Sequence, residues 1–113
     1  MHEMSLCESI VQIIEEQARV QNFERVRRVV LRVGELAAVD PRALRFCFGA
    51  VAAHGVARGA ELDIRTIPGV VWCMHCAAQV RVSRRHEACP DCGGHQTVLQ
   101  GGDDLSIQEL EVD

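Results

Sequence analysis

The sequence predicts an α+β fold, a small mixed sheet with two helices and an inserted zinc-ribbon knuckle. Three observations predict it. Two segments have the apolar spacing of amphipathic helices, and three others have the β-branched residues and alternation of strands. Two Cys-x-x-Cys pairs lie between the second and third strands. A chain of 113 residues has room for one domain, or for one domain and a small satellite.

The first helix is predicted from Leu6 onward. Its apolar residues recur at intervals of three and four, at Cys7, Ile10, Val11, Ile14 and Ala18. Two starts are open. Ser5 with Glu8 fits a capping box, which would leave residues 1–4 as a free arm, or the helix begins near His2. Either start places the amino terminus at a helix N-terminus.

A strand and a second helix follow. Alternation and β-branched residues predict a strand over 24–33, which Gly34 ends. Asp40 before Pro41 is typical of a helix cap followed by proline at the first helical position. The apolar stripe of this second helix extends to His54-Gly55.

Two further strands frame the cysteine segment. Alternation over 61–66 predicts a strand that Pro68-Gly69 stops. The last strand, 104–113, changes parity near Gln108, which predicts a bulge, and we expect it to return to the first sheet. The expected division is therefore a main α+β domain at 1–68, a zinc-binding knuckle at 69–102 and a returning strand at 103–113.

Composition narrows the class of protein. The chain is 48% hydrophobic and 25% charged, as in ordinary globular domains. Its apolar runs are shorter than the ~20 residues of a membrane span, and it does not open like a signal peptide, so we expect a cytoplasmic protein without membrane contact. A net charge of −4, the absence of lysine and only 4% aromatic residues argue against a nucleic-acid partner.

Four cysteines form the strongest motif, Cys73 and Cys76 with Cys89 and Cys92. Two such turns complete a tetrahedral thiolate shell, so we expect a structural Zn²⁺. A thioredoxin-like redox protein would use one pair at the head of a helix, and neither pair here opens a convincing helix. Alternative functions are a zinc-ribbon adaptor or nucleic-acid-binding module and a thiol oxidoreductase, although the knuckle has too little positive charge to favour phosphates.

The amino terminus is a second candidate metal site. The free amine of Met1, the next amide nitrogen and the His2 imidazole can close adjacent chelate rings, and such a nitrogen-rich planar set suits Ni²⁺ or Cu²⁺. From composition alone the signal is weak, since a histidine at position two is usually an exposed side chain at a frayed end.

The opening Met1-His2-Glu3-Met4-Ser5, the Asp40-Pro41 segment with Leu44 and Phe46 to Phe48, and the paired cysteines together resemble the HypA/HybF family of hydrogenase maturation factors. The resemblance covers essentially the whole chain. It implies a nickel metallochaperone and not an enzyme, with Met1, His2 and Glu3 at the nickel site and the four cysteines holding zinc. It also implies delivery of nickel to the [NiFe]-hydrogenase large subunit, in some members to urease too, together with a HypB-type GTPase.

Further residues have secondary roles. Asp40 matches a family acid near the nickel site, although a helix cap is its expected main role. His75 and His95 are auxiliary candidates that could replace or tune the zinc ligands, since family members carry histidines near these cysteines. Cys7 and Cys47 are expected to be small core residues. A monomer and a homodimer both stay open.

Overall fold

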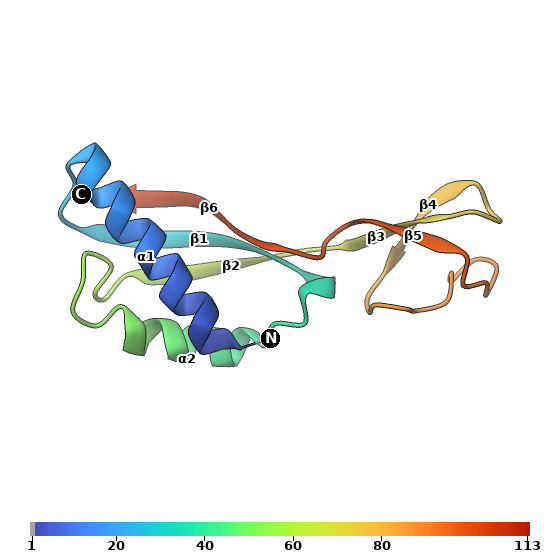
Figure 1. Cartoon of the computed structure of the whole chain (residues 1–113), viewed down its shortest axis with the longest axis horizontal. Helices are drawn as coiled ribbons and strands as arrows, with labels where there is room; N and C mark the ends of the chain where they lie inside the picture. Colours follow the sequence, from blue (N-terminus) through green and yellow to red (C-terminus); the bar gives the residue numbers. More distant parts are fainter. Residues whose placement is uncertain (1) are drawn as a thin grey trace. The chain divides into compact units, whose positions relative to one another are not determined.

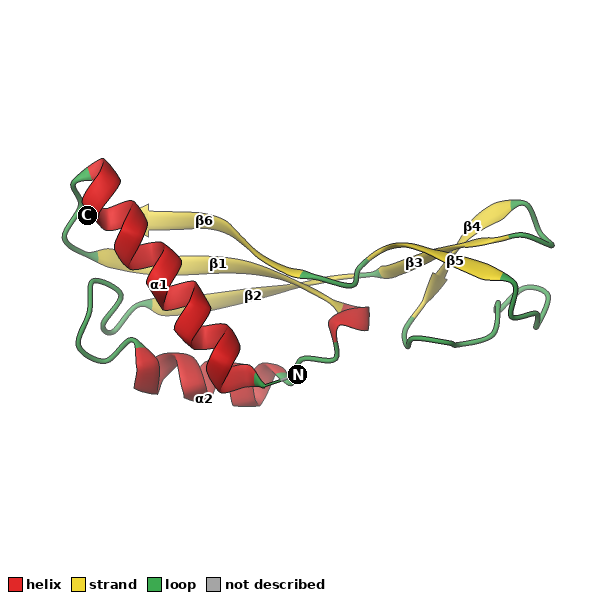
Figure 2. Ribbon diagram, in the orientation of Figure 1, coloured by secondary structure: helices red, strands yellow, loops and turns green. Residues whose placement is uncertain are grey.

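The structure, a computed structural model, describes residues 2–113 and has the predicted α+β class (Figures 1 and 2). Its elements are α1 (Glu3–Gln21), β1 (Val26–Gly34), the 3-10 helix η1 (Glu35–Ala37), α2 (Pro41–Val51), β2 (Glu61–Ile67), β3 (Gly69–Cys73), β4 (Ala78–Val82), β5 (Thr97–Gly101) and β6 (Leu105–Val112). They form two three-stranded sheets, ordered β2-β1-β6 and β4-β3-β5. None of the described helices is both long and apolar enough to cross a membrane.

The chain divides into two compact units. The first consists of residues 2–31, 39–65 and 107–113, and the second of Arg32–Ala38 and Thr66–Ser106. The division into a nickel-binding domain, a zinc-binding knuckle and a returning strand is a functional assignment and stays a prediction.

Helix α1 begins at the earlier of the two expected starts. His2 is the N-cap with extended backbone and makes no side-chain capping bond, so a free arm over 2–4 is wrong. The buried stripe is the predicted one, at Cys7, Ile10, Ile14 and Ala18. At the other end Asn22 adopts a left-handed conformation and its N–H bonds Ala18 O, which terminates the helix.

Helix α2 begins as predicted and ends early. Asp40 Oδ1 accepts the Arg42 N–H at 2.9 Å, and Pro41 follows at the first helical position. The helix stops at Val51, several residues before His54-Gly55. The following chain turns instead: the Gly55 N–H donates to Ala52 O at 3.3 Å, and the Val56 N–H then donates to Glu15 Oε2 on α1 at 2.8 Å.

In the first sheet β1 is the central strand, and it starts at Val26, two residues later than predicted. Figure 1 shows β1 and β2 running in one direction and β6 in the other, which makes the sheet mixed. The terminal strand pairs with β1, as expected, and Arg28 of β1 forms ion pairs with Asp63 of β2 and Glu111 of β6. One guanidinium group therefore links all three strands.

The second sheet was not predicted. Its strands are antiparallel, with Val71 of β3 opposite both Val80 of β4 and Leu99 of β5. From the sequence we expected only a zinc-binding knuckle at 69–102 in this part of the chain. The strands have five residues each, and β5 is mostly exposed, so they give little periodic signal. The buried cluster of this unit comprises Leu36, Val71, Val80, Val82, Cys73 and Cys89.

Candidate functional site

The structure brings the four paired cysteines together in the second unit. Their sulfur atoms all lie within 4.8 Å of one another. Cys73 Sγ is 3.6 Å from Cys92 Sγ, and Cys76 Sγ is 4.0 Å from Cys89 Sγ. A tetrahedral ion with metal–sulfur bonds of about 2.3 Å requires sulfur–sulfur edges of about 3.8 Å. The cluster thus has the dimensions of a closed four-thiolate metal site.

Backbone hydrogen bonds shape the two cysteine turns. In the first turn the Cys76 N–H donates to Cys73 Sγ at 3.4 Å. In the second, the Gly94 N–H donates to Cys92 Sγ at 3.4 Å, and the Gly93 N–H donates to Cys89 O at 2.7 Å. The left-handed φ of 74° at Gly93 allows this tight loop. Each turn therefore presents its two sulfurs to the same point.

Because the four thiols lie close together, their pKa values differ from one another. The Cys76 N–H bond, together with hydrogen bonds from neighbouring thiols, lowers the pKa of Cys73 to about 7. Hydrogen bonds with the Cys92 and Cys73 sulfurs, together with burial, raise the pKa of Cys76 to about 12. One thiolate forms readily and opposes the formation of the next. A bound cation would stabilise all four as thiolates.

At the other candidate site the N-termini of the two helices meet within the first unit. The backbone N–H of Asp40 donates to Glu3 Oε2 at 3.3 Å. His2 is exposed, and its carbonyl accepts the Leu6 N–H at 3.1 Å. The structure therefore joins Glu3 and Asp40 at the two helix starts, with His2 one residue before Glu3, and Asp40 has its expected capping role. Within residues 2–113 the side-chain ligand atoms of these three residues do not converge as the cysteine sulfurs do. Met1 lies outside the described residues.

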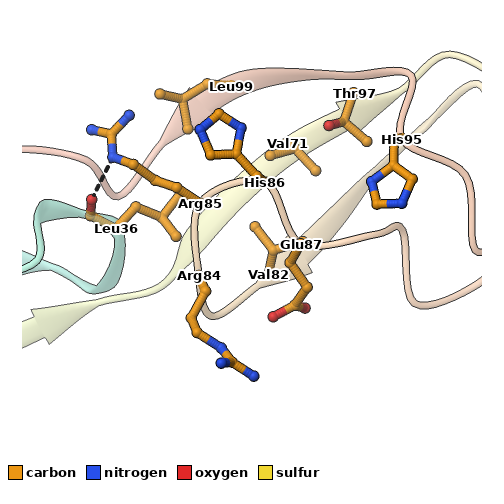
Figure 3. Close-up of a pocket in the computed structure, with 10 residues that line it drawn as sticks. All are labelled: Leu36, Val71, Val82, Arg84, Arg85, His86, Glu87, His95, Thr97 and Leu99. Atoms are coloured by element: carbon orange, nitrogen blue, oxygen red, sulfur yellow. Dashed lines mark hydrogen bonds between the residues drawn. The ribbon is translucent and has the colours of Figure 1, made fainter.

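The auxiliary histidines do not join the four-sulfur cluster. His75 and His95 are both exposed, and across residues 2–113 the cysteine sulfurs are the one group of candidate ligand atoms that converges. His95 lines a cavity together with His86 instead (Figure 3). Roles for His75 and His95 at the metal stay predictions.

The remaining cysteines lie between the helices. Cys7 is fully buried, as expected, and its thiol donates to Leu44 O at 3.4 Å. Burial, and then the charges of Cys47 and Glu3, raise its pKa to about 11. Cys47 is only half-buried, so its expected place in the core is partly wrong. Cys7 is thus held as a neutral thiol.

Sequence reasoning missed two features. The first is Glu15, which is half-buried and accepts a hydrogen bond from the Val56 N–H, a contact across 41 positions that no local pattern indicates. The second is the cavity in Figure 3. The sequence feature that could have indicated it is the run Arg84-Arg85-His86, which lines the cavity together with His95.

Comparison with known proteins gives a consistent result. Residues 1–112 match the HypA family, described as hydrogenase/urease nickel incorporation, metallochaperone. The hydrogenase maturation factor HypA of Rhodopseudomonas palustris strain TIE-1 is 55% identical over 113 residues, the full length of both chains. HypA 2 of Bradyrhizobium diazoefficiens is 50% identical over the same span. The solution structure of the Ni metallochaperone HypA from Helicobacter pylori has a TM-score of 0.72 at 24% identity, covers 99% of this chain and 97% of that one, and supports the fold alone.

Proposed function

Since this chain belongs to the HypA family of hydrogenase and urease nickel incorporation metallochaperones, and so is a metal carrier and not an enzyme, we propose that it binds Ni²⁺ at its amino terminus. The proposed ligands are the Met1 amine, the neighbouring backbone nitrogen and the His2 imidazole, with Glu3 and Asp40 beside them. The nickel is cargo, and the recipient we propose is the [NiFe]-hydrogenase large subunit.

The hydrogen bond between Asp40 N–H and Glu3 Oε2 is the observation that carries this proposal. It fixes the start of α1 against the start of α2, so the acidic residues Glu3 and Asp40 meet at the helix starts, and the exposed His2 directly precedes Glu3. The positive end of a helix dipole eases loss of an amide proton, and the carboxylates offset the charge that would repel a cation. A square-planar nitrogen site for Ni²⁺ fits these groups.

Nickel titration of matched variants tests the site. His2→Ala and a short extension ahead of Met1 should each abolish tight binding, because one removes the imidazole and the other displaces the amine. His54→Ala is the control, since His54 is an exposed histidine in the same unit. Acidification should also weaken binding, because amine and imidazole must be deprotonated to bind nickel. Unchanged binding by the extended chain and His2→Ala would place the site elsewhere, with His75 and His95 as the next candidates.

For the four-cysteine site we propose a structural Zn²⁺. Four thiolates in a closed tetrahedral shell are the ligand set that zinc favours in structural sites. The purified protein should contain about one zinc per chain, and Cys89→Ala should lose it together with the fold of the second unit. A metal-free protein with a Cys73–Cys76 disulfide would support the redox alternative instead.

A HypB-type GTPase is the partner that we propose for the first unit. The outer face of α1 carries the exposed acidic residues Glu8 and Glu16 and the exposed apolar residues Ile13 and Val20. Ile13→Glu should weaken GTPase binding, whereas Arg81→Gln in the second unit should not. Binding that depends only on the second unit would contradict this placement. We place the protein in the cytoplasm, where thiols stay reduced and available to metal.

A further inference from the structure

Two cysteines outside the metal-binding set lie on the two helices of the first unit. Cys7 of α1 is fully buried, and Cys47 of α2 is half-buried. Both are free thiols, and neither of the proposed metal sites uses them. What two such thiols can do depends on how close they are to each other and on which of them solvent reaches.

One hydrogen bond places the sulfur of Cys7 beside Cys47. The Cys7 thiol donates to Leu44 O at 3.4 Å. In an α-helix a carbonyl oxygen lies against the side chain three residues further along, which is why serine and threonine side chains bond carbonyls three or four residues back. The residue three positions after Leu44 is Cys47. The same proximity affects acidity, since Cys47 is, after burial, the largest cause of the raised pKa of Cys7.

The backbones of the two helices are held together at this point. The Asp40 N–H donates to Glu3 Oε2, and the Cys7–Leu44 bond follows four residues further along each chain segment, so both contacts join residues 37 positions apart. Two successive contacts therefore fix the first turns of α1 and α2 side by side. A disulfide requires such a close approach, because it tolerates Cα–Cα distances of only about 4.4 to 6.8 Å.

The two thiols differ in their access to solvent. Cys47 is half-buried, and its neighbours one turn away on the same side of α2, Ala43 and Ala50, are small. Cys7 has no exposed surface, and its pKa of about 11 keeps it protonated. A small oxidant dissolved in water therefore reaches Cys47 first, and Cys7 reacts only through Cys47.

We propose that Cys7 and Cys47 are a peroxide-responsive thiol pair that closes into a disulfide between α1 and α2. The Cys47 thiol loses its proton, and its sulfur takes one oxygen of hydrogen peroxide as the O–O bond breaks and water leaves. The Cys7 sulfur then attacks the Cys47 sulfur of this sulfenic acid. The S–S bond forms, the S–O bond breaks, and the hydroxyl group leaves with the Cys7 proton as a second water. The two thiols lose two electrons, which the peroxide gains.

The disulfide would tie the two helices together one turn from the contact between Glu3 and Asp40. It would close a loop between residues 7 and 47 and so restrict the unfolded chain, which stabilises the first unit. The pair is separate from the four-cysteine cluster in the second unit and does not depend on the proposed nickel ligands.

Peptide mapping after oxidation tests the proposal on the zinc-loaded full chain. The protein is treated with an equimolar amount of hydrogen peroxide, its remaining thiols are alkylated, and it is digested with trypsin. Cleavage after arginine places Cys7 in peptide 1–19 and Cys47 in peptide 46–58, apart from the four paired cysteines. The expected product is peptide 1–19 linked to peptide 46–58, lighter than their sum by two hydrogen atoms and separated again by dithiothreitol.

Two single variants separate the roles of the thiols. Cys7→Ser should stop at the sulfenic acid of Cys47, which dimedone traps. Cys47→Ser should leave the buried Cys7 unmodified. Oxidation should raise the melting temperature of the helical circular dichroism by at least about 5 °C in the wild-type chain and by less than about 1 °C in Cys47→Ser.

Several results would overturn the proposal. These are oxidation of Cys47 without the linked peptide, a disulfide from Cys47 to a paired cysteine or to a second chain, and modification of Cys7 in Cys47→Ser at the wild-type rate. The mapping of the wild-type chain decides the matter if Cys7→Ser does not fold. Zinc content before and after oxidation shows that the four-cysteine cluster stays intact.

Discussion

Glu3 performs a structural task inside the proposed nickel site. Its carboxylate lies in the first turn of α1, where negative charge offsets the helix dipole, and it bonds the Asp40 N–H. Replacing Glu3 would therefore disturb both helix starts as well as the proposed nickel site. His2 is the better probe, because its side chain makes no capping bond, so its removal should leave the fold unchanged.

Cys7 gives a residue-scale prediction about alkaline stability. Its pKa rises from 9.0 to about 11 in the folded chain, so the unfolded thiol ionises first. The contribution of the neutral Cys7 thiol to the free energy of unfolding is fully present below about pH 9 and falls as the pH rises toward 11. The loss is about 2 kcal/mol near pH 10.5. Urea unfolding of wild type and Cys7→Ala from pH 8 to 10.5 checks it. Parallel curves for the two proteins would contradict the prediction.

At the scale of elements, the sequence predicted the features that depend on interactions between nearby residues. The α1 stripe, the Asp40-Pro41 start of α2 and the paired cysteine turns each depend on residues a few positions apart. The segment after α2 is bonded to Glu15, and the start of α2 is bonded to Glu3, and both partners are distant in sequence. The contact between the two helix starts was indicated only by the family resemblance, which placed Asp40 near the nickel site, and not by any periodic pattern.

Glycines permit a close crossing of strand ends in the second unit. Leu36 N–H donates to Gly102 O at 2.7 Å, and Gly34 N–H donates to Asp104 O at 2.8 Å. A Cβ on Gly102 would lie 2.3 Å from Pro68 O, and its φ of 79° is left-handed. A side chain there meets both a steric clash and backbone strain.

Gly102→Ala should therefore lower the free energy of unfolding by more than about 2 kcal/mol, since the left-handed backbone alone costs about 1 to 2 kcal/mol. The neighbouring Gly101→Ala is the control, because its Cβ would have no atom within 4 Å. It should change stability by less than about 0.5 kcal/mol. Urea unfolding followed by Trp72 fluorescence measures both, and equal effects would refute the steric argument.

At the scale of the whole molecule, the two units are stabilised by different means. The first buries a helix stripe and the central strand β1, with fully buried Ile14, Leu31 and Leu44. The buried cluster of the second is small, and Cys73 and Cys89 are themselves part of it. A unit of this size rarely supplies enough apolar burial alone and usually needs a metal or a disulfide.

Removing the metal should therefore unfold the second unit and spare the first. A thiol-reactive mercurial with a chelator should change the fluorescence of Trp72, the one tryptophan of the chain, and collapse the chemical-shift dispersion of the amide signals of β3, β4 and β5. The helical circular dichroism of α1 and α2 should persist, and nickel should still bind a chain that retains His2. Reversing the mercurial with excess thiol and adding zinc should restore the Trp72 signal. If the helical signal is lost at the same zinc occupancy as the Trp72 signal, the two units unfold together, and the closed thiolate site stabilises the whole chain and not the second unit alone.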